Sequence, residues 1–171
     1  MAFDLRADVA EIPRKTDSHK FTFDLKLAKE VRELRAAEEI DDKLLSSKEA
    51  ELAEKTYTAE LASVPRRRRE EIYEDSLDAF PAKPSFFGNQ VDESTQFKRN
   101  NWVRIQLVAA AVQALVKGAS DRLEDRDGIL DAIEFIHNEA PDQIFASLEE
   151  KVNEINAEED EQDALNKSAD F

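Results

Sequence analysis

The sequence lacks several residue types and patterns, and each absence excludes a class of protein. It contains no cysteine, which excludes disulfides, thiolate zinc sites and cysteine nucleophiles. It has only three glycines, too few for the many turns of a strand-rich fold. No apolar run approaches the roughly 18 residues that a membrane span needs, and MAFDLRADVAEIPRK lacks a signal-peptide core. We therefore expect a soluble, cytoplasmic protein without a membrane partner.

Positive charge is scarce as well. The chain carries 39 acidic residues against 24 lysines and arginines, a formal net charge of -15. Because lysine and arginine supply most of the affinity for phosphate, we expect no nucleic-acid partner. The same charge favours high solubility and partners that are basic or apolar. An acidic protein that imitates DNA is a further alternative.

What the sequence does contain is typical of helices. Hydrophobic residues make up 41% of the chain, enough for a core, and they recur at helical spacing among alanine, glutamate, leucine and lysine. We predict a mainly α-helical fold, a small domain of about five helices. The expected helical ranges are 27–52 with a break near Asp41 and Asp42 or near Ser46 and Ser47, 65–79 opened by Pro65, 96–117 ended by Gly118, 129–138 capped by Asp127, and 141–157 opened by Pro141.

Two short segments alternate apolar and polar residues instead. Phe21, Phe23 and Leu25 form one such series, and residues 56–64 form the other. They are compatible with one short two-stranded β-ribbon. We thus expect an N-terminal arm over residues 1–20, a single helical domain over 21–157, and an acidic, flexible tail over 158–171.

No segment presents a pattern typical of catalysis or of ligand binding. Residues 125–134 partly match a calcium-binding loop, but its first ligand position holds Leu123, so capping of the following helix by Asp125 and Asp127 is the better interpretation. His19 and His137 belong to no metal-binding motif. We expect no catalytic residue, no cofactor site and no metal site, and therefore no enzyme.

The positive charge that exists is concentrated in one run, Arg66 to Arg69. In a helix opened by Pro65, Arg66 can reach Glu70 and Arg67 can reach Glu71. Arg68 and Arg69 have no acid four residues ahead, so we expect them to face carboxylates elsewhere. The sequence leaves open whether several aromatic side chains lie in the core or in an interface, and we include them as candidates. The candidate partner-binding residues are Arg66, Arg67, Arg68, Arg69, Phe86, Phe87, Phe97 and Trp102.

Two stretches resemble a known family. TYTAELASVPRRRREEI and the later FKRNNWVRIQLVAAAV are similar to tail assembly chaperones of long non-contractile-tailed bacteriophages, particularly those that infect actinobacteria. The likeness extends over residues 48–72 and 97–155. It implies an assembly factor in the host cytoplasm that binds the tape measure protein, keeps it soluble and recruits tail tube subunits.

Other functions remain compatible with the sequence. A structural head–tail joining protein would also be helical and non-enzymatic, and an acidic regulator that imitates DNA is the third possibility. Self-association into a homo-oligomer stays open as well.

Overall fold

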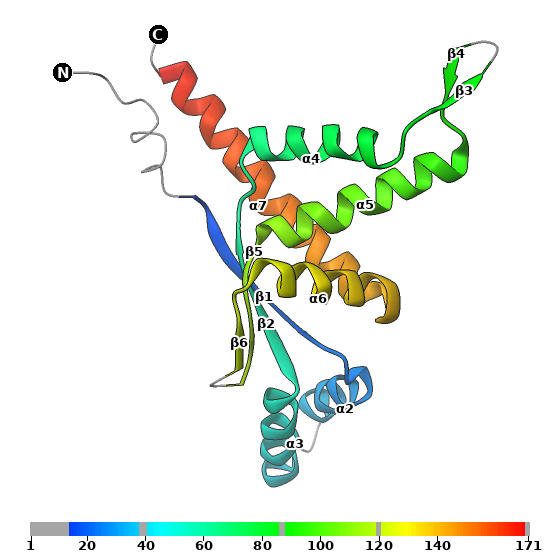
Figure 1. Ribbon diagram of the computed structural model, residues 1–171. Coiled ribbons are helices and arrows are strands. Elements are labelled where there is room, and N and C mark those ends of the chain that lie inside the picture. Colours follow the sequence, from blue (N-terminus) through cyan, green and yellow to red (C-terminus); the bar gives the residue numbers. More distant parts are fainter. Residues whose placement is uncertain (1–13, 38–40, 86–87, 119–120, 170–171) are drawn as a thin grey trace.

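The computed structural model describes residues 14–37, 41–85, 88–118 and 121–169, with side chains described over 14–37, 41–82, 91–118 and 121–161 (Figure 1). These ranges are mostly helical, which confirms the predicted class, and they hold six helices rather than about five. The helices are α2 (Leu25–Ala36), α3 (Asp42–Glu54), α4 (Arg66–Ala79), α5 (Glu93–Ala111), α6 (Arg126–Glu139) and α7 (Asp142–Ala169). The strands are β1 (Thr16–Thr22), β2 (Thr56–Ala62), β3 (Lys83–Ser85), β4 (Gly88–Gln90), β5 (Val112–Lys117) and β6 (Asp121–Leu123).

The main sheet is antiparallel, with the order β1-β2-β5-β6. Pairing of β1 with β2, which places Phe21 opposite Tyr57, confirms the predicted ribbon, but its first strand lies earlier than expected: Phe23 is in the bend after β1 and Leu25 begins α2. The ribbon is however only half of a four-stranded sheet. β1 also begins at Thr16, so the last residues of the predicted N-terminal arm belong to the sheet.

The prediction of one helix over 96–117 was wrong for its last six residues, 112–117. α5 ends at Ala111, and the chain continues as β5, which pairs with β2 on one side and β6 on the other. Residues 108–116 are apolar almost throughout, so a helix and a strand would bury them equally well. Pairing with β2, a segment more than fifty residues away, decides for the strand.

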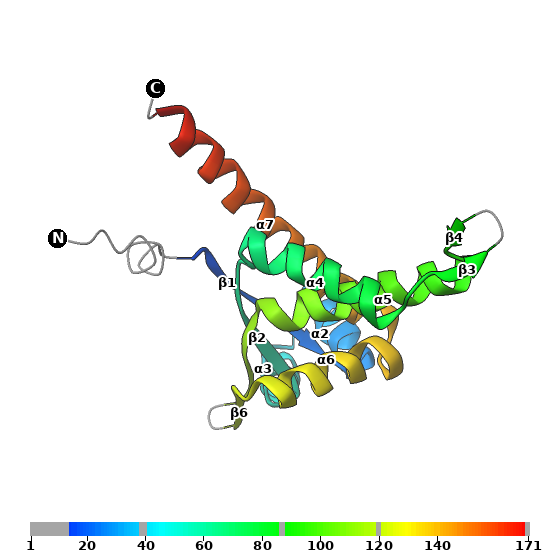
Figure 2. The same ribbon diagram turned by 45° about the horizontal axis from the view of Figure 1, so that its top comes forward.

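The core lies between one face of the sheet and the helices α5, α6 and α7 (Figure 2). Strand side chains alternate between the two faces, and Ala59, Leu61 and Leu115 point to the helices. Ile133 from α6 and Leu148 from α7 meet them, and both are fully buried. No helix in the described part of the chain has the length and apolar character needed to span a membrane.

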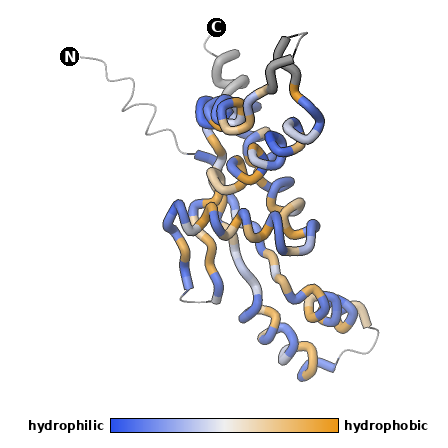
Figure 3. The backbone as a smooth tube through the Cα atoms, turned by 45° about the vertical axis from the view of Figure 1, so that its right-hand side comes forward, coloured by the Kyte–Doolittle hydropathy of each residue, from blue (hydrophilic) through white to orange (hydrophobic). Residues whose placement is uncertain are grey.

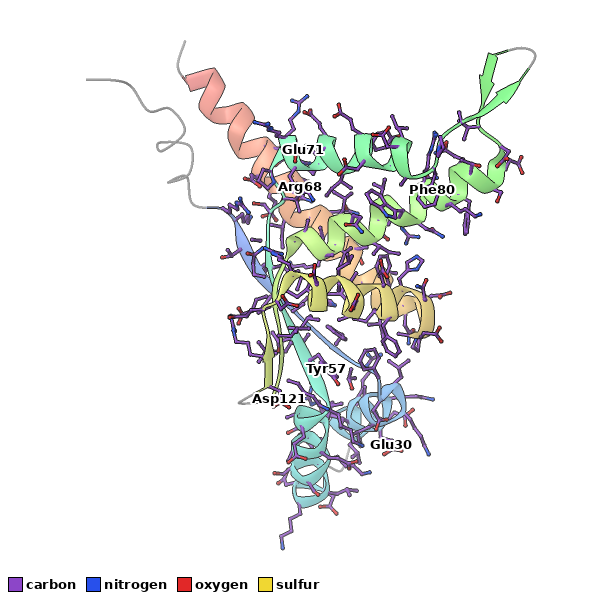
Figure 4. The ribbon with its side chains drawn as sticks, viewed as in Figure 1. Glu30, Tyr57, Arg68, Glu71, Phe80 and Asp121 are labelled. Carbon is purple, nitrogen blue, oxygen red and sulfur yellow. The ribbon has the colours of Figure 1, made fainter. Side chains whose placement is uncertain are left out.

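Two helix pairs extend from this centre. α2 and α3 form a hairpin inserted between β1 and β2, and it projects from one end of the sheet (Figure 1). Apolar and polar residues alternate along both helices (Figure 3). Asp41 caps α3 by accepting hydrogen bonds from the amides of Lys43 and Leu44, so the break lies at the first of its two predicted positions, and Ser46 and Ser47 lie within α3. α4 and α5 form the second pair, fixed where Arg99 Nε donates to the carbonyl of Phe80 at 2.7 Å (Figure 4).

The ends of the last two helices differ in how well the sequence anticipated them. Asp125, not Asp127, caps α6, because its carboxylate accepts from the amide of Gly128 at 2.8 Å. α7 begins at Asp142, directly after Pro141, as predicted. Its backbone is helical through the range assigned to an acidic tail, 158–171, as far as Ala169.

Candidate partner-binding site

Four aromatic side chains gather at the end of the sheet nearest the α2–α3 hairpin. Phe21 stacks on Tyr57 with ring centroids 5.5 Å apart and an interplanar angle of 13°. Phe23 meets the Tyr57 ring edge-on at 5.3 Å, and Phe135 of α6 meets Phe23 edge-on at 6.5 Å. We call these four residues the aromatic cluster. Tyr57 lies on β2, near the start of the strand, which follows α3 (Figure 4).

Part of the aromatic cluster is open to solvent. Phe21 is buried, but Phe23 is 38% exposed and Phe135 is 57% exposed. Phe23 occupies the bend between β1 and the start of α2, and Phe135 lies beside the buried face of α6 rather than on it. Large apolar side chains exposed next to one another are typical of surfaces that bind another molecule.

A groove adjoins the aromatic cluster and shares Tyr57 with it. Its volume is about 540 Å³, and it opens between α6 and the ends of β2, β5 and β6. Leu115 and Leu123, which are paired across β5 and β6, form its apolar floor with Ala132 of α6. We call this pocket the aromatic groove; its lining is Tyr57, Leu115, Lys117, Asp121, Arg122, Leu123 and Ala132.

The cations beside the aromatic groove have different roles. Lys117 Nζ lies 5.2 Å from the centre of the Tyr57 ring, close enough for a cation–π contact. The Arg122 guanidinium instead donates to both carboxylate oxygens of Glu60 at 2.7 Å. Bonds to Glu60 and to Glu124 raise the pKa of Arg122, and the bond from Arg122 lowers the pKa of Glu60. Both cations line the groove: Arg122 is held by Glu60 and Glu124, and Lys117, opposite Asp121 in the register of β5 and β6, contacts the Tyr57 ring.

The predicted arginine run lies in the first turns of α4, and its pairing follows the sequence for three of four residues. Arg66 bonds Glu70 at 2.9 Å and Arg67 bonds Glu71 at 3.1 Å, as predicted. Arg69 bonds both carboxylate oxygens of Asp160 on α7, at 2.6 and 3.0 Å, which confirms its distant partner. The expectation was wrong for Arg68, which bonds Glu71 one turn ahead at 3.2 Å (Figure 4).

The arginine run is thereby part of a junction that holds α4 against α7. The bond to Asp160 raises the pKa of Arg69, and the reciprocal bond from Arg69 lowers the pKa of Asp160. Next to this pair, the buried side chain of Asn156 accepts a hydrogen bond from the amide of Val64 at 2.8 Å. A structural role therefore accounts for Arg69 without a partner.

Arg68 also borders a second pocket, of about 470 Å³, between the start of α4, the end of α5 and the start of α6. The Arg126 guanidinium lies in this pocket and donates to the carbonyl of Val112 at 2.8 Å. We call it the arginine cleft; its lining is Arg14, Val64, Pro65, Arg68, Gln106, Ala109, Ala110, Arg126, Asp127 and Leu130.

The four apolar candidates predicted from the sequence lie elsewhere. Phe86 and Phe87 are outside the described residues. Phe97, near the start of α5, is 66% exposed, and Trp102 is half-buried on the same helix. Neither of them lines the aromatic groove or the arginine cleft.

Sequence reasoning missed the residues of the aromatic groove, although one signal was present in the adjoining aromatic cluster. Phe135 is 57% exposed on α6. Ile129, Ile133 and Ile136 are the buried residues of α6, at spacings of four and three, and Phe135 falls off that series. An aromatic residue beside an amphipathic stripe, rather than on it, was the available signal.

The described residues also bear on the calcium-like segment. Asp125 is engaged in capping α6, and no three acidic or histidine side chains in the described ranges are grouped as a metal site requires. Comparison of the chain with protein-family models, with curated proteins and with solved structures gave no match.

Proposed function

We propose that this protein is a tail assembly chaperone of long non-contractile-tailed bacteriophages. It binds the tape measure protein, keeps that protein soluble and recruits tail tube subunits, without catalysing a reaction. The sequence likeness over residues 48–72 and 97–155 supports the proposal. The aromatic groove with its exposed neighbours supports it independently, because it offers a binding surface of the kind that such a chaperone needs.

The observation that carries the proposal is the exposure of Phe23 and Phe135 beside the aromatic groove. A long helical protein with apolar stripes aggregates unless those stripes are covered. Full burial of an exposed phenylalanine contributes about 1.5–3 kcal/mol before the costs of association, and Phe23 and Phe135, at 38% and 57% exposure, can contribute about half of that each. The two phenylalanines and the apolar groove therefore offer one contact point for an apolar helical segment, to which further contacts must add.

Charge completes the mechanism. A net charge of -15 keeps the complex of chaperone and tape measure protein soluble, since like-charged complexes repel one another. Lys117 at the edge of the groove places one local cation where an acidic residue of the bound segment can meet it. The apolar contact thus holds the partner, and the acidic surface keeps the complex apart from other complexes.

Co-expression with the tape measure protein and the tail tube protein tests this function. We expect both to co-purify with the chain and the tape measure protein to become more soluble. The double variant Phe23→Ser, Phe135→Ser should lose most of this effect. Tyr73→Ser, Leu77→Ser is the matched control, because it removes two exposed apolar side chains from α4 instead. The proposal fails if neither protein co-purifies with the unaltered chain.

Mass spectrometry of purified virions separates the chaperone from the head–tail joining protein. A chaperone leaves the particle before the virion is complete, whereas a joining protein persists in a fixed copy number. Recovery of the chain from virions in constant proportion would therefore replace the proposed function with the structural one.

A further inference from the structure

The arginine cleft combines positive charge with an apolar floor. Arg14, Arg68 and Arg126 bring three guanidinium groups to a pocket with one carboxylate, that of Asp127. Val64, Pro65, Ala109, Ala110 and Leu130 supply the apolar part of its surface. Such a surface fits a short segment that carries both acidic and apolar side chains.

A segment of that chemistry is attached to the rim of the cleft. Residues 1–13, MAFDLRADVAEIP, lie outside the described residues and are followed directly by Arg14, which lines the cleft. The segment contains three acids, Asp4, Asp8 and Glu11, against a single arginine. Its apolar residues Phe3, Leu5, Val9 and Ile12 are interleaved with these acids.

We propose that residues 1–13 bind in the arginine cleft of their own chain. Their carboxylates pair with Arg68 and Arg126, and their apolar side chains pack on the floor formed by Val64, Ala110 and Leu130. Residues 1–13 can reach the cleft, because an extended chain spans about 3.3 Å per residue and Arg14, which follows them directly, lines the cleft. Attachment also supplies a high effective concentration, so weak individual contacts are sufficient.

Binding of residues 1–13 supplies carboxylates to guanidinium groups that have few carboxylate partners in the arginine cleft. Arg68 bonds Glu71 only at the exposed surface of α4, and Arg126 already bonds a backbone carbonyl, which is neutral. Arg14 lines the cleft and has no ion pair with another described residue. The three acids of residues 1–13 neutralise guanidinium charge in the arginine cleft that other carboxylates of the chain leave largely unpaired. The inference stands apart from the proposed function, since it concerns a contact within one chain.

The chain offers a direct test because it has no cysteine. Full-length protein with Ala10→Cys carries a single nitroxide label, whose mobility is read by electron paramagnetic resonance at low salt. We expect an immobilised component that decreases at high salt, since screening weakens contacts between partly exposed charges. A label at Ser46→Cys on the exposed side of α3 is the control and should not respond to changes in the cleft.

Gln106, in the lining of the cleft, provides the matched variants. Gln106→Glu adds a negative charge and should lower the ratio of bound to free segment, whereas Gln106→Lys should raise it. Because an exposed charge pair contributes up to about 1 kcal/mol, we expect each variant to change the ratio by up to about fivefold, in opposite directions. Charge reversal at Asp4, Asp8 and Glu11 to lysine should invert the order of the two variants.

Three results would overturn the proposal. The label is equally mobile in every variant if the segment does not bind, and the immobilised fraction is equal in both Gln106 variants if it binds elsewhere. An immobilised fraction that rises with protein concentration assigns the cleft to the segment of a second copy. Unchanged unfolding transitions of the Gln106 variants establish that the readout reports binding rather than loss of the fold.

Discussion

One face of the main sheet is buried by helices at one end and open at the other. Ala59 and Leu115, paired across β2 and β5, are buried beneath the helices, whereas the next pair on the same face is Tyr57 and Lys117, at the aromatic groove. Both pairs belong to the same strands, the same face and the same register. Their burial therefore differs because the helices cover only one end of this face. The covered end supplies the energy of folding, and the open end keeps apolar surface that folding does not use.

The largest expected effect distinguishes two residues of α6, one at each end of this face. Ile133→Ala should lower the free energy of unfolding by about 2–5 kcal/mol, because Ile133 is fully buried at the covered end. Phe135→Ala should change it by about 0.5 kcal/mol or less, since that ring is mostly exposed. Urea denaturation measures both. Equal losses would mean that Phe135 belongs to the core and that the open end is not open.

A smaller effect is expected where α7 meets the end of β2. Asn156→Ala should cost about 1–3 kcal/mol, because the buried amide of Val64 loses its hydrogen-bond acceptor. Asn153→Ala, on the exposed side of the same helix, should be nearly neutral. If both variants unfold at the same urea concentration, the Val64–Asn156 bond does not hold this junction.

Charged side chains extend the comparison at lower energy. Arg69→Ala breaks the pair with Asp160 and should cost up to about 1 kcal/mol in low salt, with a smaller loss in high salt. Arg67→Ala should have no measurable effect, because Arg67 pairs within its own helix at the surface. Thermal unfolding at two ionic strengths distinguishes the variants, and a salt-independent loss at Arg69 would point to lost packing instead of lost charge.

The smallest effect concerns His19, which lies at the covered end beside Ser147 of α7. Burial is the main cause that lowers the pKa of His19, and the charge of Lys151 lowers it further. The folded protein therefore resists protonation more than the unfolded chain does. Its stability is complete above the usual histidine pKa of about 6.5 and decreases as the pH falls through the lower folded value. Unfolding of His19→Gln between pH 7.5 and 5 should show a weaker dependence on pH.

Local signals in the sequence predicted much of this fold. Pro65 opens α4 and Pro141 precedes α7, and the carboxylate of Asp41 caps α3, because these residues act on their immediate neighbours. The pairs of Arg66 with Glu70 and of Arg67 with Glu71 follow from helical spacing alone.

The elements that were missed depend on distant contacts. β5 forms because β2 is available to pair with it, and an apolar run such as residues 108–116 does not express that preference. The aromatic groove was missed for the same reason, since Tyr57, Leu123 and Ala132 come from three separate elements. Nothing in their spacing indicates that they lie together.

The order of the strands along the chain determines when, during synthesis, the aromatic groove can form. β2 ends at Ala62 and its neighbour β5 begins at Val112, so the ribosome must make all of α4 and α5 before the two strands can pair. The lining of the groove then continues to Ala132. A nascent chain that has emerged only as far as α4 can form the β1–β2 ribbon, but it has no groove. Binding at this surface thus requires that synthesis has passed Ala132.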